Sequence, residues 1–203
     1  MSQLCPVFPP LSPRALSVTD CALSGRMMIL RDPGGTTLPC LVIPAEHADA
    51  TAINRMATHG RGLVCLALDS RIVDNLQLTL QPQTNRRRFG MPFTVSIEAK
   101  HAVSTGISAA DRAATVAAAI HPGAVPEDLA TPGHVFPIRV ERASPPAGSG
   151  VPRAAVEICA RAGLRPAAVI CEILDPSGAA PAVEWLDRLA RALELPVFET
   201  TEF

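Results

Sequence analysis

Hydrophobic positions along the chain fall into short continuous runs and into longer stretches with helical spacing. The runs, with one alternating segment, predict buried or half-buried strands at 27–30, 38–43, 62–68, 92–99 and 169–174. The longer stretches predict helices at about 13–24, 50–60, 109–120, 153–162 and 182–195. Strands and helices interleave without a repeat or a clear linker. This order predicts one α/β or α+β domain over residues 1–203, with 1–12 as an extended N-terminal segment.

Several predicted helices carry residues that favour their ends. Ser12, followed by a proline, is typical of a helix start, and Gly25 is typical of a helix end. Asp49 is expected to cap the second helix. Ser108 with Asp111 resembles a capping box ahead of an alanine-rich helix, although the usual acid is glutamate.

Composition and charge narrow the classes of partner. Hydrophobic residues make up 48% of the chain, and the formal net charge is −1 at pH 7, so no global field attracts nucleic acid or an anionic membrane. The only basic run, residues 86–88, is interpreted as a solvated loop, with a phosphate or partner contact as the alternative. No apolar stretch approaches the roughly 18 residues of a spanning helix, and the N-terminus does not resemble a secretory signal.

The cysteines suggest a reducing compartment. None of the six belongs to a CxxC pair, and most lie in apolar surroundings; they stand at positions 5, 21, 40, 65, 159 and 171. This usage favours buried thiols in the cytoplasm over disulfides or a zinc site. No glycine-rich phosphate loop is present either.

Several segments together carry a family resemblance. HGRG at 59–62, TGISAADRA at 105–113 and PGHVFP at 132–137 occur in this order, with LVIPAE at 41–46 and FTVSIEA at 93–99. Over about residues 14–200 the chain resembles 3,4-dihydroxy-2-butanone 4-phosphate synthase, a riboflavin-pathway enzyme. The resemblance implies a synthase-like α/β (α+β) domain with a mixed sheet flanked by helices. It also implies a homodimer, and magnesium-dependent conversion of ribulose 5-phosphate into a four-carbon ketone phosphate and formate.

The sequence departs from the family where the family has an acidic loop, roughly DDEDRENEGD, after the first strand. Here residues 31–40 read RDPGGTTLPC. The metal-binding glutamate of the family falls on Thr36 or Thr37, and a substrate-contacting aspartate falls on Cys40. Asp32 is the only acid left in this stretch.

A second family element, roughly RRGHTEA, departs in the same way. Its metal-binding histidine falls on Val151, its threonine on Pro152 and its glutamate on Arg153, and its phosphate-binding arginine falls within AGSG at 147–150. Valine has no lone pair for a metal, and loss of a guanidinium removes a bidentate phosphate clamp. We therefore expect no metal and no other cofactor, and no useful turnover of ribulose 5-phosphate.

Two residues match family positions implicated in catalysis. His134 in PGHVFP and Glu172 in VICEIL are predicted to share one cavity as a catalytic acid/base pair, with retained ancestral scaffold as the equal alternative. Such a pair would raise the pKa of the histidine and lower that of the glutamate.

Three further residues are candidates for substrate binding. Arg61 is expected to bind an anion, or else to form a buried ion pair. Thr105 and Ser108 are weaker candidates, since a turn residue and a helix cap explain them as well.

Three functions remain open. The first is a repurposed, metal-independent biosynthetic enzyme of the lyase or isomerase type, acting on a small carbonyl or hydroxy compound. The second is a non-catalytic partner or regulatory homologue of the synthase. The third is the ordinary synthase. In each case we expect a cytoplasmic homodimer that does not bind nucleic acid or membrane, with a small-molecule substrate if it is an enzyme.

Overall fold

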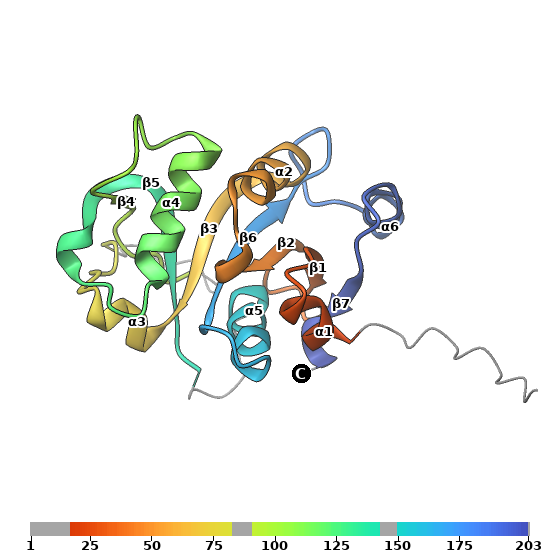
Figure 1. The fold of residues 1–203 in the computed structure, drawn as a ribbon. Helices are drawn as coiled ribbons and strands as arrows, with labels where there is room; N and C mark the ends of the chain where they lie inside the picture. The colour runs from red at the N-terminus through yellow and green to blue at the C-terminus, as the bar shows by residue number, and fades with distance from the viewer. Residues whose placement is uncertain (1–16, 83–90, 143–149, 203) are drawn as a thin grey trace, which may run out of the picture.

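The computed structural model of the protein describes residues 17–82, 91–142 and 150–202, and it contains one seven-stranded mixed sheet (Figure 1). Across the sheet the strands run in the order β4-β5-β3-β6-β2-β1-β7. In chain order they are β1 (Met28–Arg31), β2 (Cys40–Pro44), β3 (Arg61–Asp69), β4 (Ile97–Ala99), β5 (Leu129–Val140), β6 (Ala167–Ile173) and β7 (Val197–Glu199). The pairs β3–β5 and β1–β7 are parallel, and the remaining pairs are antiparallel.

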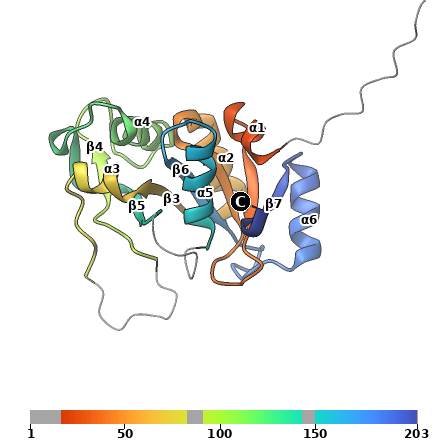
Figure 2. The same ribbon diagram turned by 90° about the horizontal axis from the view of Figure 1, so that it is seen from below.

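Helices cover both faces of this sheet. They are α1 (Val18–Leu23), α2 (Ala50–Gly60), α3 (Ser70–Asn75), α4 (Ala109–Ile120), α5 (Gly150–Arg161) and α6 (Val183–Ala192), with single 3-10 turns at Ala45–His47, Pro126–Asp128 and Thr200–Glu202. Figure 1 shows α2 above and α5 below the central strands, and Figure 2, seen from below, brings α5 to the front. The sheet is therefore the middle layer of three.

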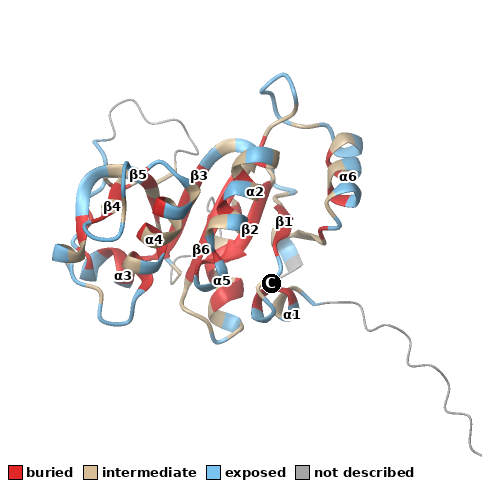
Figure 3. Ribbon diagram, turned by 45° about the horizontal axis from the view of Figure 1, so that its top comes forward, coloured by how far each residue is buried: buried red, intermediate tan, exposed pale blue. Residues whose placement is uncertain are grey.

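Alternation along the central strands divides the core between the two faces. Val64 and Leu66 of β3 belong to the cluster that packs under α2 and α4, whereas Cys65 belongs to the cluster under α5 and α1. Ile170 and Cys171 of β6 divide between the same two clusters. A strand buried on both faces reads as a continuous apolar run, which is why 62–68 and 169–174 were recognisable (Figure 3).

Most predicted elements are confirmed, with shifts at their ends. Asp49 caps α2 and Ser108 caps α4, as predicted. The predicted helix start at Ser12 lies outside the described residues, and α1 is capped by Ser17 in a capping box with Asp20. Helix α5 begins at Gly150 rather than Arg153, because a proline is compatible with the first turn of a helix.

The largest errors concern the strands around residues 92–140. Only Ile97–Ala99 of the alternating segment forms a regular strand, since Phe93 and Thr94 make isolated bridges to Ile138 and Leu80 instead. A strand is expected from Val135 with His134 in the loop before it, but β5 begins at Leu129 and includes His134. The short α3 and β7 were not predicted from sequence. Prolines 132 and 137 lie within β5 and interrupt its apolar pattern.

The thiols that the structure describes are free and buried, as predicted. Burial raises their pKa, to about 12 for Cys159 and about 11 for Cys171, so they remain protonated at neutral pH. Cys5 and the basic run at 86–88 lie outside the described residues. None of the described helices has the length and apolar character needed to cross a membrane.

Truncating Leu66 to alanine should lower the free energy of unfolding by about 2–5 kcal/mol, because its fully buried side chain would leave a cavity in the sheet centre. Leu63, in the same strand, is 46% exposed, so Leu63→Ala should cost about 1 kcal/mol or less. Urea unfolding followed by circular dichroism measures both. Equal losses in the two variants would contradict this placement of β3.

Candidate active site

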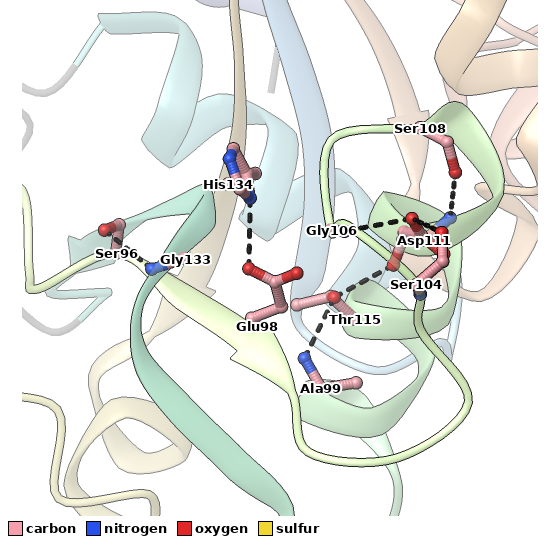
Figure 4. Close-up of polar contacts among 10 residues, drawn as sticks. All are labelled: Ser96, Glu98, Ala99, Ser104, Gly106, Ser108, Asp111, Thr115, Gly133 and His134. Carbon is pink, nitrogen blue, oxygen red and sulfur yellow. Dashed lines mark hydrogen bonds and ion pairs between the residues drawn. The ribbon is translucent and has the colours of Figure 1, made fainter.

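An ion pair joins strands β4 and β5 at one side of the sheet. The Nδ1 atom of His134 lies 3.0 Å from Oε2 of Glu98 (Figure 4). The Glu98 side chain is 16% exposed and that of His134 is 43% exposed, so the carboxylate lies beneath the imidazole. Because Glu98 occupies Nδ1, Nε2 is the ring nitrogen left to act on a ligand.

The backbone before His134 is held closely against β4. The Gly133 N–H donates to Oγ of Ser96 at 3.1 Å. A Cβ on Gly133 would lie 2.1 Å from the carbonyl oxygen of Ile97, so only glycine permits this approach. These contacts orient His134 from its main chain as well as from its ring.

A loop over residues 104–106 packs against the same carboxylate. Asp111, which is buried, accepts hydrogen bonds from the Ser104 N–H at 3.0 Å, the Ser104 hydroxyl at 2.9 Å and the Gly106 N–H at 3.0 Å (Figure 4). These bonds, the Ser104 N–H first, lower the pKa of Asp111 despite its desolvation. A Cβ on Gly106 would overlap the Glu98 carboxylate, so the loop lies directly against Glu98.

The three predicted substrate-binding residues occupy different positions. Thr105 is exposed within the loop that Asp111 holds, next in sequence to Gly106. The Ser108 hydroxyl accepts a hydrogen bond from the Asp111 N–H at 3.0 Å. It therefore caps α4, which is the structural role that the sequence indicated as an alternative to substrate binding. Arg61 is exposed and adopts a left-handed conformation with φ 67° after α2, so a buried ion pair does not account for it.

Glu172 lines a separate hollow of about 450 Å³ on the α5 side of the sheet. The other lining residues are small, hydroxylated or apolar, namely Gly35, Thr36, Thr37, Leu38, Met91 and Phe93. Burial raises the pKa of Glu172 above its ordinary value. A carboxyl group in this state can donate a proton as well as accept one.

The structure corrects the expected pairing of His134 with Glu172. Cys65 of β3 pairs with Phe136 of β5 on one side and with Ile170 of β6 on the other, and the two candidates lie two residues beyond those partners. The regular register reaches neither candidate, and on the β6 side it shifts between Arg61 and Val64. Glu172 lines the hollow described above, and His134 is not among the described residues that line it. His134 pairs with Glu98 instead, and the pKa of Glu172 is raised by burial rather than lowered by a histidine.

Sequence reasoning did not assign a role to Glu98. The one available signal was its place as the sole acid in the alternating segment PFTVSIEA at 92–99. That pattern does not reveal a partner 36 residues away.

The loop after β1 and the start of α5 meet beside the Glu172 hollow. The Val151 N–H donates to Oγ1 of Thr37 at 3.1 Å. Asp32 accepts hydrogen bonds from the N–H groups of Gly34, Thr36 and Thr37 and from the Thr36 hydroxyl. Burial opposes ionisation of Asp32, but these bonds outweigh it and lower its pKa.

Proteins of one family share this sequence and fold. The family model for 3,4-dihydroxy-2-butanone 4-phosphate synthase matches residues 18–203. The synthase of Neisseria meningitidis serogroup A is 42% identical over 80% of this chain, and that of Chromobacterium violaceum is 36% identical over 95%. The chain belongs to the 3,4-dihydroxy-2-butanone 4-phosphate synthase family. The expected family resemblance is thereby confirmed.

Solved synthase structures confirm the α/β fold with its mixed sheet. A synthase crystallised in complex with two magnesium ions is 32% identical, with a TM-score of 0.83 and 91% of each chain covered. A two-domain synthase from A. baumannii gives a TM-score of 0.84 at 34% identity, covering 90% of this chain and 54% of that one. The chain spans about half the length of the two Neisseria synthases it matches, but 92% of the Chromobacterium synthase.

The residues present do not fit the metal site that the synthase resemblance implies. Val151, at the position of the metal-binding histidine, is fully buried and offers no donor atom. The Thr37 hydroxyl is engaged by the helix, and Asp32 by its own turn. Within the described ranges, no three His, Cys, Asp or Glu side chains gather as a metal site would require.

Glu172→Gln should stabilise the protein increasingly as the pH rises from acid to neutral. Since burial raises the folded-state pKa of Glu172, its contribution to stability is fully present below the unfolded value of about 4.3 and is lost as the pH rises through the folded value. Glutamine does not titrate, so the free energy of unfolding of the variant does not decrease for this reason as the pH rises.

Denaturant unfolding at a series of pH values measures the difference between variant and wild type. The same substitution at the exposed Glu127 is the control. Wild-type and Glu172→Gln curves that stay parallel across this range would show that Glu172 is not desolvated.

Proposed function

We propose that the chain catalyses the synthase reaction of its family, converting ribulose 5-phosphate into 3,4-dihydroxy-2-butanone 4-phosphate and formate. The observation that carries this proposal is similarity to named synthases at 36–42% identity, extending over almost the whole chain. The comparisons support this function better than the repurposed enzyme that the sequence placed first. The two products together contain the atoms of the substrate, so no added oxidant is needed. Acid/base groups would serve the proton transfers that accompany loss and re-addition of water and the breaking of the carbon–carbon bond.

The pair formed by His134 and Glu98 supports the proton transfers. With Nδ1 against the buried carboxylate, Nε2 of His134 is positioned as the base that removes a proton beside the sugar carbonyl. Glu98 is a positioning residue that holds the ring through the contact at Nδ1. Thr105, in the adjoining loop, is proposed to contact a substrate hydroxyl, and Arg61 the phosphate.

Glu172 supplies a second acid/base group in this proposal. Its raised pKa favours the protonated form, which suits donation to an oxygen or carbon as bonds rearrange. No step is assigned to a metal, because Thr36, Thr37 and Val151, where the resemblance places the family's two ligands, do not offer a carboxylate or an imidazole.

A second function, a repurposed enzyme acting on an uncharged carbonyl or hydroxy compound, is favoured by one observation. The Glu172 hollow is lined by hydroxyl and apolar groups, and no described Lys, Arg or His side chain lines it. A phosphate dianion would find no positively charged partner among the described residues that line the hollow. The two functions differ in whether a phosphorylated sugar is required.

We also propose that the chain forms a homodimer in the cytoplasm. The exposed Leu63 and Ile107, at 46% and 56%, are apolar side chains that a subunit contact would cover. Light scattering at micromolar concentration should give twice the chain mass of 21.3 kDa. A clean monomer would contradict the dimer.

Formate release from ribulose 5-phosphate should be detectable with wild-type protein, and His134→Ala should reduce kcat/KM by about 100-fold or more. Glu98→Gln should reduce it by roughly tenfold while leaving KM little changed, because it weakens the orientation of the ring rather than substrate contact. A coupled formate dehydrogenase assay measures both.

His121→Ala is the matched control, since the imidazole of this exposed histidine accepts a hydrogen bond from the Gly123 N–H and is not part of the candidate site. Absence of formate from folded wild-type protein would refute the synthase function. Turnover of an unphosphorylated hydroxyketone in its place would establish the second function. A His134→Ala variant with wild-type rates would remove His134 from the mechanism.

A further inference from the structure

The contact between Thr37 and Val151 joins two segments that are 114 residues apart in the chain. In the family resemblance these segments supply the two protein ligands of one metal, so the ion is also a link between them. Here the link is a hydrogen bond of 3.1 Å from a helix-start N–H to a threonine hydroxyl. It satisfies one of the backbone donors that every helix start leaves unpaired.

The loop and the start of α5 are in close contact at this bond. A Cβ on Gly150 would lie 2.3 Å from Oγ1 of Thr37, so loop and helix are already in close contact. The Val151 side chain is fully buried within the α5 cluster and points no donor toward the loop.

The loop itself is organised without a cation. Asp32 turns inward and accepts four hydrogen bonds from residues 34–37. The Thr200 hydroxyl adds a further contact to Asp32 at 3.3 Å from the C-terminal segment. The loop is thereby held from both its own backbone and its neighbours.

We propose that the Thr37 hydroxyl replaces the family's metal as the link between loop 32–38 and α5. The Glu172 hollow then keeps its shape without a divalent ion. Thr37 is a positioning residue in this scheme. The scheme concerns the construction of the site and holds for either reaction considered above. It assigns a site residue that the family pattern does not contain.

Hydrogen exchange of the Val151 amide, resolved by NMR, tests the link directly. Thr37→Val removes the hydroxyl at nearly constant volume and should speed exchange at Val151 by roughly two- to tenfold, the range expected for one hydrogen bond. Thr37→Ser keeps the hydroxyl and should restore protection. Thr36→Val is the matched control, because the Thr36 hydroxyl bonds to Asp32 rather than to the helix.

The second claim, that the contact between Thr37 and Val151 needs no divalent ion, is tested on wild-type protein in magnesium chloride and in a chelator. Exchange at Thr37 and Val151 should be the same in both conditions. Slower exchange of these amides in magnesium would show that an ion still joins the segments and would overturn the proposal. Unchanged protection of Val151 in Thr37→Val would overturn it as well, whatever the activity of that variant.

Discussion

The pairing of β3 with β6 is the constraint on which the rest of the structure depends. Both strands lie in the middle of the sheet and are covered by α2 on one face and α5 on the other. A charged side chain within such a layer would lose its hydration, so polar groups are confined to the strand ends. Arg61 and Glu172 stand at the same end of this pair, which is where the candidate site is built.

Three carboxylates of the candidate site differ in their hydrogen bonding and burial, and each therefore has a different role. Asp111 is surrounded by hydrogen-bond donors and stabilises the loop that carries Thr105. Glu98 lies beneath His134 and orients it. Glu172 is desolvated in an otherwise hydroxyl and apolar hollow, which raises its pKa. Carboxylates whose environments differ in this way can divide structural and chemical tasks within one small region.

The same environment explains how the chain retains a synthase fold while departing from the family at two segments. The loop 32–38 satisfies its polar groups internally through Asp32, and Thr37 connects it to α5. Both contacts are made by the chain's own backbone and side chains, so neither requires an ion. The sheet and its helices can therefore remain as in relatives of 36–42% identity.

The sequence by itself determined the elements whose signals are local. Continuous apolar runs revealed the central strands, and Asp49 and Ser108 marked the starts of α2 and α4, since a cap acts within three residues. The order of HGRG, TGISAADRA and PGHVFP was specific enough to indicate the family. Short elements such as α3 and β7 escaped because their residues carry no periodic pattern of sufficient length.

Only the tertiary structure decided which side chains meet. The partner of His134 depends on the register between β4 and β5, and a register shift within that pair places Glu98 beside the imidazole. The contact of Thr37 with Val151 depends on how α5 packs against the sheet after more than a hundred intervening residues. Strand order and helix packing are set by the burial of whole faces, so no local pattern of residues specifies these pairs.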